Sequence, residues 1–490
     1  MNDLAVALNK HGLNFLTDHQ YELAESFFRE AIVHAQLADA YTNLGVVLYL
    51  NKRYDDAAIA LHQSCTLRPS HPETLLNLGY CLCLTKDFEG ARAAFQRAID
   101  LADLPLAHIA LGSLYVELCD LDKAIEHSRI GLRHHPDSVI ARDTLREVLH
   151  HKGNEAEALA ECDILFNLAP EYPQHRYKRS LVMLTYGNPE GWAEHECRYA
   201  GYGSRNKLLQ SGHENPQWFS RLFGKRWEGQ RTEHLMVHTE QGFGDIIQFM
   251  RFIPLAAERC AKLSVYLPPA LRRLARQSFK LPNLDICDEV PTEFNHYCLI
   301  MSLPYLLERT QDIPPPPYLV AGKHSYGEIR RLDGIKIGVA WQGIHSHRDN
   351  RWRSMPFETM TRLFSLPANF ISLQLPCDID FSHTPLIDVH PVPIPYDGGM
   401  MLDWTETAAL IDALDLVICV DTAVAHMAGA IGKPVWLLNR FNTDWRWMLH
   451  RTDSPWYPSM RIFRQPKMGD WDSVMETVIS ELQYLISDDA

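Results

Sequence analysis

The sequence predicts an α + α/β protein, in which a helical repeat solenoid precedes a region of two α/β halves. Three observations predict this fold class. The first third of the chain repeats every 33 or 34 residues, strand and helix patterns alternate from about residue 232, and a run of prolines at 314–317 divides that alternation. Repeats of this length indicate stacked helix pairs, and alternating strands and helices indicate parallel sheets.

The repeat shows best in its small residues. Glycines recur at intervals of 33, 34 and 33 residues, and an alanine follows each after twelve residues. These positions are Gly12, Gly45, Gly79 and Gly112, with Ala24, Ala57, Ala91 and Ala124. Small residues let two helices approach closely, so four helix pairs are expected, with a fifth, weaker unit over 139–172 where Arg146 replaces the glycine. The array either binds an extended peptide on its concave face or only scaffolds or dimerises.

The α/β region contains short apolar runs that are typical of buried parallel strands. In the first half they cover 234–238, 262–267 and 297–301, with helices expected over 246–259 and 270–277. In the second half they cover 336–341, 370–375, 415–420 and 434–438. The expected domains are therefore 1–172, a helical junction at 173–231, and α/β halves at 232–317 and 318–490. Ligands of such sheets bind beyond the carboxyl ends of the strands.

Composition narrows the function classes. The chain has 490 residues, of which 46 % are hydrophobic and 22 % charged, as in soluble globular proteins. A net charge of −14 without a basic run argues against nucleic-acid partners. The eleven cysteines lack zinc-ligand spacing and are expected to be reduced. With neither a signal peptide nor a membrane span in evidence, a cytoplasmic location is expected.

The turn after the first strand of the first half is one candidate site. Gly242 and Gly244 allow close backbone approach, and Asp245 follows them at the start of the expected helix. A carboxylate at the ligand end of a strand can accept a proton. The alternative is that Asp245 only caps its helix.

A second candidate site follows the strand at 415–420. Free N–H groups at the start of the next helix, the Thr422 hydroxyl and the His426 imidazole together suit a phosphate. Asp421 would repel a phosphate, so it is expected to cap the helix or to hold His426 or a ribose.

Two further clusters are basic or aromatic. The loop from Trp341 to Ser354 carries Arg348, Arg351 and Arg353, which could neutralise a diphosphate, together with His345, His347 and Asp349. The two histidines lack a third metal ligand, so a zinc site is not expected. The segments 444–447, 454–457 and 461–465 either pack on the core or stack on a sugar or base.

These motifs carry a family resemblance. In order, they are GFGDIIQFMRFIP (242–254), GVAWQGIHSHRDNRWRS (338–354), DLVICVDTAVAHMAGAIGKPVWLL (415–438) and DWRWM (444–448), preceded by PEGWAEHECR (189–198). Behind tetratricopeptide repeats, they resemble bacterial fusions with a domain of glycosyltransferase family 9, the family of lipopolysaccharide heptosyltransferases. The resemblance implies a GT-B fold of two Rossmann-like halves, with the nucleotide-sugar donor on the C-terminal half, the acceptor on the N-terminal half, and neither a metal nor another cofactor.

The resemblance also implies roles for residues. Asp245 matches the proposed catalytic base, and Thr422, Ala423 and His426 match the loop and helix that hold the donor diphosphate. Ala423 stands where many heptosyltransferases have glycine. Arg353 and Ser354 fall in a second phosphate loop, and Gln374 is a weaker donor candidate. The supporting residues expected around the site are Gly242, Gly244, Asp421, Trp341 and Arg446.

The function expected from these features is sugar transfer from a nucleotide-diphosphate donor to an acceptor hydroxyl, with inversion implied by the family. No heptose-recognition signature is present, so a protein acceptor recruited by the repeats, such as a surface or flagellar protein, is preferred by analogy. The alternatives are an inactive scaffold that retains the fold, a transferase acting on lipopolysaccharide or another saccharide, and a sugar-nucleotide epimerase. An oligomer formed through the repeats is left open.

Overall fold

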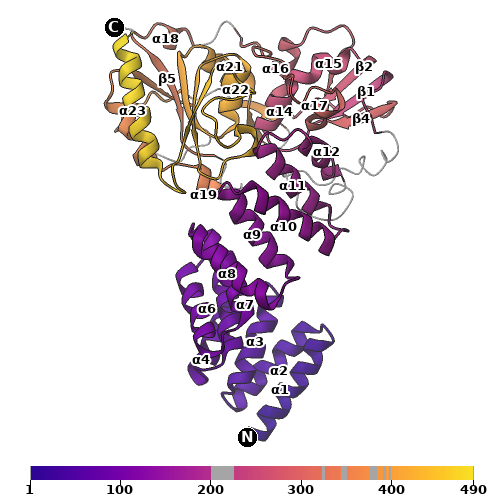
Figure 1. Ribbon diagram of the computed structural model, residues 1–490, viewed down its shortest axis with the longest axis vertical. Helices are drawn as coiled ribbons and strands as arrows, with labels where there is room; N and C mark the ends of the chain where they lie inside the picture. The colour runs from indigo at the N-terminus through magenta and orange to yellow at the C-terminus, as the bar shows by residue number, and fades with distance from the viewer. Residues whose placement is uncertain are drawn as a thin grey trace. The chain divides into compact units, whose positions relative to one another are not determined.

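The computed structural model describes residues 2–199, 226–322, 326–343, 350–374, 383–389, 393–396 and 399–488. The chain divides into two compact units, Met1–Pro170 and Glu171–Ala490. The first unit is helical and the second contains parallel sheets covered by helices (Figure 1). The predicted α + α/β fold class is confirmed. No helix in the described ranges combines the length and the apolar character that a membrane crossing requires.

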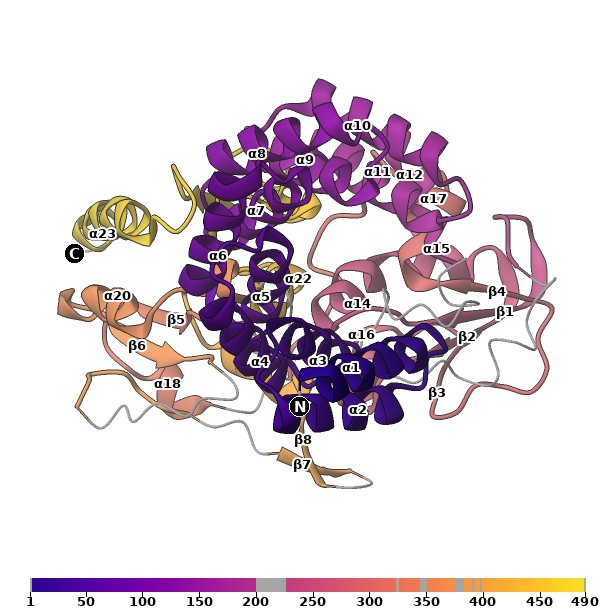
Figure 2. The same cartoon turned by 90° about the horizontal axis from the view of Figure 1, so that it is seen from below.

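The first unit consists of helices that follow one another along a curved array (Figure 2). They are α1 (Asn2–Thr17), α2 (Tyr21–His34), α3 (Ala38–Leu50), α4 (Tyr54–Leu67), α5 (Pro72–Leu84), α6 (Phe88–Ala102), α7 (Pro105–Glu117), α8 (Leu121–His134), α9 (Val139–His151) and α10 (Glu155–Leu168). The weaker fifth unit of the sequence therefore forms a helix pair like the others, α9 and α10.

The repeated glycines lie where the two helices of a pair come closest. A Cβ placed on Gly12 would lie 2.5 Å from the Phe28 ring, and one on Gly79 would lie 2.4 Å from the Phe95 ring. Contacts this short exclude any side chain, so glycine on one helix and a large residue on the next form one packing unit. In the fifth pair, Arg146 is buried and donates to Asp143 (2.9 Å) instead.

The junction that follows the repeats is part of the second unit. Its helices are α11 (Pro173–Thr185) and α12 (Gly191–His195). The Trp192 ring lies 6.1 Å from Phe249 and 5.3 Å from Trp445, so it packs against both α/β halves. Arg198 is buried and pairs with both oxygens of Glu240, in the loop after the first strand (2.9 and 2.8 Å).

The first α/β half is a parallel sheet in the order β3-β2-β1-β4. Its strands are β1 (Thr232–His238), β2 (Cys260–Tyr266), β3 (Leu284–Cys287) and β4 (His296–Leu299). Its helices are α14 (Phe243–Phe249), η3 (Met250–Phe252), α15 (Ile253–Ala257), α16 (Pro269–Ser278), η4 (Ile300–Ser302) and α17 (Leu303–Leu306). Three shorter helices, α14, η3 and α15, thus replace the single helix expected over 246–259. Pro254 lies in the first turn of α15, where a proline is tolerated.

The second half is a parallel sheet in the order β11-β10-β9-β5-β6. Its strands are β5 (Lys336–Ala340), β6 (Asn369–Ser372), β9 (Leu416–Val420), β10 (Val435–Asn439) and β11 (Met460–Arg464), beside an antiparallel hairpin of β7 (Pro393–Tyr396) and β8 (Gly399–Leu402). Its helices are α18 (Gly327–Arg330), α19 (Asn350–Arg353), α20 (Phe357–Thr361), η5 (Arg362–Ser365), α21 (Trp404–Asp412), α22 (Ala423–Ala430), η6 (Trp445–Trp447) and α23 (Trp471–Asp488). Because β6 and β9 flank β5, the strand order reverses between β5 and β9.

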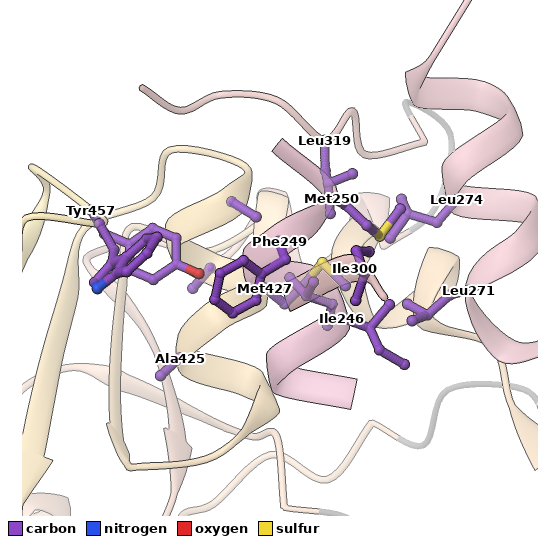
Figure 3. Close-up of a cluster of buried hydrophobic side chains, with 14 of the residues drawn as sticks. Ile246, Phe249, Met250, Leu271, Leu274, Ile300, Leu319, Ala425, Met427 and Tyr457 are labelled. Carbon is purple, nitrogen blue, oxygen red and sulfur yellow. The ribbon is translucent and has the colours of Figure 1, made fainter. Parts of the chain in front are cut away.

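The two halves share one hydrophobic core. Figure 3 shows Ile246 and Phe249 of α14 beside Met427 and Ala425 of α22, with Tyr457 at one end of the cluster. Arg251 crosses the same boundary, because its guanidinium donates to the carbonyl oxygens of Trp456 (2.7 Å) and Pro314 (3.2 Å). One side chain of the first half therefore bonds both the proline-rich segment and the second half.

Candidate active site

The candidate site lies at the topological switch point of the second sheet. Ligands of open α/β sheets bind outside the carboxyl ends of the strands where the order reverses. Here those ends are the turn at 341–343 after β5 and the turn at 421–422 after β9. Trp341, Gln374, Asp421 and Thr422 follow β5, β6 and β9 within two residues. Ala423 and His426 lie on α22, and Arg353 and Ser354 lie at the end of α19 and just after it.

Helix α14, which carries Asp245, contacts helix α22, which carries His426. A Cβ placed on Gly244 would lie 2.8 Å from Cδ2 of His426 and 3.5 Å from Cα of Ala423. The first turn of α14 therefore rests on the first turn of α22. Gly244 is required by this close approach, since any side chain would push the two helices apart.

Asp245 has two contacts, one in each half. Its Oδ2 accepts the N–H of Gly242 (2.9 Å), which caps the start of α14 as the alternative interpretation predicted. Its Oδ1 accepts Nη2 of Arg446, 201 residues further along the chain. The carboxylate is thus held at the boundary between the halves, with its side chain 18 % exposed.

Arg446 joins three acceptors. It donates to Asp245, through Nη1 to Asp444 (2.8 Å), and through Nε to Gln248 (2.9 Å). Burial opposes the charge of this guanidinium, but the carboxylates of Asp245 and Asp444 outweigh it and raise the pKa of Arg446. The group is a permanent cation beside Asp245.

His426 is buried, and its imidazole is neutral. Its Nδ1 lies 2.9 Å from the Tyr457 hydroxyl, and the Trp447 ring lies 5.0 Å from its own. Burial, with the positive charge of Arg446 adding to it, lowers the pKa of His426 to about 3. The residue can therefore offer a phosphate a hydrogen bond but not a positive charge.

The lowered pKa of His426 predicts acid sensitivity. Because the unfolded chain binds this proton at about pH 6.5, the free energy of unfolding should be independent of His426 above that pH. As the pH falls toward 3, it should drop by up to about 1.4 kcal/mol per pH unit. Guanidinium unfolding followed by tryptophan fluorescence at pH 7, 6 and 5 measures this slope. His426→Gln should flatten it, and an equal slope in the variant would contradict the assignment.

The turn before α22 carries Asp421 and Thr422. Thr422 is the N-cap residue of α22, but its side chain makes no capping bond, and its Oγ1 is buried without a partner among the described residues. Asp421 lies outside the cap, so helix capping does not explain it. Burial, together with the charge of Asp444, raises the pKa of Asp421, while Arg353 and Arg440 oppose this rise.

Arg353 at the end of α19 and Ser354 just after it lie against the turn that follows β5. Ser354 Oγ accepts the N–H of Gly343 (3.1 Å) and donates to Oδ1 of Asn350 (2.9 Å). Nε of Arg353 is buried and has no partner in the described part of the chain, and its charge acts on Asp421. The other members of this predicted cluster, His345, His347, Arg348 and Asp349, lie outside the described residues.

Two predicted donor-side residues have structural contacts instead. The Oε1 of Gln374 accepts the N–H groups of Trp341 (3.1 Å) and Gln342 (2.8 Å), and its Nε2 donates to the Gln342 carbonyl (3.0 Å). Trp341 is 1 % exposed and packs on Phe357. Gln374 thus fixes the backbone of the turn after β5, of which Trp341 is the first residue.

Sequence reasoning gave no individual role to Gln248, Asp444 or Tyr457, although each lies in a segment that it singled out. Gln248 contacts Arg446 and Tyr457 contacts His426 from distant segments, whereas Asp444 contacts Arg446 within its own segment. For the aromatic segments, the alternatives were packing on the core and stacking on a sugar or base. Their side chains pack on the core, since Trp445, Trp447, Trp456 and Tyr457 are all buried in it.

Comparisons with known proteins agree with this architecture. The model of glycosyltransferase family 9 (heptosyltransferase) matches residues 400–467, which include β9, α22 and Arg446. The tetratricopeptide repeat model matches residues 9–72 and 58–104. The two models match separate parts of the chain, the repeats in the first unit and family 9 in the second, and the family 9 match supports glycosyltransferase activity.

Individual relatives differ in the extent of the match. Protein FlbA of Caulobacter vibrioides is 26 % identical over 507 residues, covering 94 % of this chain and 76 % of its own. BBSome complex member BBS4 of Mus musculus is 28 % identical over 124 residues, covering 25 % of this chain and 24 % of its own. The crystal structure of MamA covers 35 % of this chain and 94 % of its own at 20 % identity, with a TM-score of 0.32.

Proposed function

We propose that the second unit transfers a sugar from a nucleotide-diphosphate donor to a hydroxyl group of an acceptor. The observation that carries the proposal is the meeting of α14 and α22, which brings a carboxylate, a neutral imidazole and a permanent cation to one switch point. Such a set provides a proton acceptor and groups that stabilise a departing diphosphate.

The donor diphosphate would lie at the start of α22. Its oxygens would accept the first-turn N–H groups, the Thr422 hydroxyl and the N–H of His426, while Arg353 supplies positive charge from the turn after β5. Oγ1 of Thr422 and Nε of Arg353 are buried and have no partner among the described residues, which supports this placement, since buried polar atoms are normally satisfied. These groups would balance the diphosphate charge without a metal ion.

Asp245 would act as the general base. It would take the proton of the acceptor hydroxyl as the hydroxyl oxygen bonds to the anomeric carbon and the bond from that carbon to the diphosphate oxygen breaks. Attack opposite the leaving group would invert the anomeric configuration. Arg446 would hold the carboxylate in one orientation between turnovers, because it donates directly to Oδ1.

We propose further that the acceptor is a protein recruited by the repeats. Tetratricopeptide arrays bury a continuous core and leave an extended concave surface that other such proteins use for binding. A protein acceptor would explain why the repeats and the transferase domain share one chain. A saccharide acceptor stays the alternative for the same chemistry.

Nucleotide binding tests the donor part of the proposal. A nucleotide-sugar at about 100 times its dissociation constant should raise the free energy of unfolding of the second unit by about 2.7 kcal/mol. Tryptophan fluorescence reports this unit alone, because all 11 tryptophans follow Pro170. A panel of UDP-, GDP-, ADP-, CDP- and dTDP-sugars should contain at least one that stabilises. If none of them did, an inactive scaffold would explain the chain better.

A further inference from the structure

The loop after β10 forms a buried polar cluster beside the proposed donor site. Asn439, Asn442 and Gln465 are 0 %, 4 % and 2 % exposed. Amide side chains are seldom this deeply buried unless hydrogen bonds satisfy them. The contacts of these three residues therefore show which of them the fold itself uses.

Internal bonds fix most of this loop. Asn439 Nδ2 donates to the Thr443 hydroxyl (2.8 Å), and Gln465 Oε1 accepts the N–H groups of Phe441 and Gly469 (3.1 Å each). The N–H of Gln465 also donates to the Asn439 carbonyl (3.0 Å). The loop is thus tied to the end of β11.

Asn442 differs from its neighbours. Its Oδ1 and its Nδ2 are both buried, and within the described residues neither has a hydrogen-bond partner. Leaving a whole amide unsatisfied is costly, and a native protein retains such a group where a ligand or an ordered molecule completes it. The loop thus holds in place an amide to which no other described residue forms a hydrogen bond.

In the sheet, Asn442 and Arg353 lie on opposite sides of β9. β10 pairs with β9, with Leu438 opposite Val420, so the loop after β10 runs beside the turn at Asp421 and Thr422. The residues that flank Asn442 share this environment, since Arg440 and Asp444 both act on the charge of Asp421. β5 and its Arg353 turn lie on the other side of β9.

We propose that Asn442 binds hydroxyl groups of the transferred sugar, an inference that rests on the proposed function. A diphosphate would use the cations and N–H groups between β5 and β9. A neutral amide with one acceptor and two donors instead complements hydroxyl groups, which both donate and accept. Asn442 is then a determinant of sugar specificity and not of nucleotide affinity.

Calorimetric titration of Asn442→Ala separates these two roles. The probes are UDP, GDP, ADP, CDP and dTDP, each beside commercial sugar esters of the same nucleotide. In the variant, affinity for the nucleoside diphosphate that the wild type binds best should stay within about twofold, while affinity for its sugar ester should fall at least about tenfold, as loss of one or two good hydrogen bonds implies. Equal losses for both ligands, or no loss for the sugar ester, would overturn the proposal.

Stability supplies a second readout that does not need the correct sugar. Because no described residue makes a hydrogen bond to the Asn442 amide, Asn442→Ala should melt no lower than the wild type. Thr443→Val should melt lower, since it removes the acceptor of Asn439. Equal destabilisation by both variants would show that Asn442 is structural. A wild type that binds no nucleotide would refute the proposed function itself, whereas nucleotide binding that does not distinguish the sugar ester would refute only the role of Asn442.

Discussion

Asp245→Asn is expected to lower kcat by about 10²- to 10⁴-fold, the usual contribution of a general base. An amide cannot take the proton of the acceptor hydroxyl, but it occupies the same volume. The donor would bind through α22 and the turn after β5, so its dissociation constant should change by no more than about threefold. Single-turnover assays, with donor affinity measured separately by calorimetry, give both quantities.

The control for this variant is Asp444→Asn. Asp444 pairs with the same guanidinium as Asp245, through Nη1 of Arg446, but it lies on the C-terminal half, next to η6. If Asp245 acts only by neutralising Arg446, the two variants should lose similar turnover. If Asp245 is the base, Asp444→Asn should retain most of the wild-type rate. Near-normal turnover of Asp245→Asn with the true acceptor would remove it from the mechanism.

The repeats could be predicted from the sequence because their packing is local and periodic. Each glycine meets a residue of the next helix in the same unit, as Gly79 meets Phe95. The contact therefore appears in the sequence as a constant spacing between the glycine and the residue that it meets. The fifth unit is weaker in sequence because Arg146 replaces the glycine. In the structure an ion pair with Asp143 holds the buried Arg146 side chain, and a glycine pattern does not anticipate this.

The sheets were predicted where their strands are continuously apolar, and missed where charged residues interrupt the apolar ones. β9 is buried along its whole length and reads as a continuous apolar run. β11 reads in the sequence as part of a basic and aromatic cluster, because Arg461 and Arg464 interrupt its apolar residues. It lies at the edge of the sheet. In β3, Asp285 interrupts the apolar residues in the same way.

The candidate site was predictable as far as strand ends indicate it. Asp245, Thr422 and His426 each follow a strand that the sequence identifies, and the structure brings all three to the contact between α14 and α22. The partners that position them, Arg446 for Asp245 and Tyr457 for His426, come from distant segments. Gln374 was proposed as a donor contact because it follows a strand, but its amide bonds the backbone of the neighbouring turn.

Arg198→Ala is expected to destabilise the second unit by about 3–5 kcal/mol, the usual cost of breaking a buried ion pair. The Arg198 side chain is fully buried and bonds Glu240 through two nitrogens, Glu196 (2.6 Å) and the Ser302 hydroxyl (2.6 Å). Burial opposes its charge, but these carboxylates raise its pKa well above the usual range. Removing the guanidinium takes from Glu240 the cation that spans both its oxygens.

Guanidinium unfolding followed by tryptophan fluorescence measures this loss in the second unit alone. Arg309→Ala is the matched control, because Arg309 pairs with Asp312 on the surface (46 % and 75 % exposed) and should cost about 0–1 kcal/mol. Adding Glu240→Gln to Arg198→Ala should recover part of the loss, since it removes one of the stranded charges. A loss no larger than that of Arg309→Ala would contradict the role of the network. Since Glu240 belongs to the loop that leads into Asp245, the network that stabilises the junction also holds the proposed base in place.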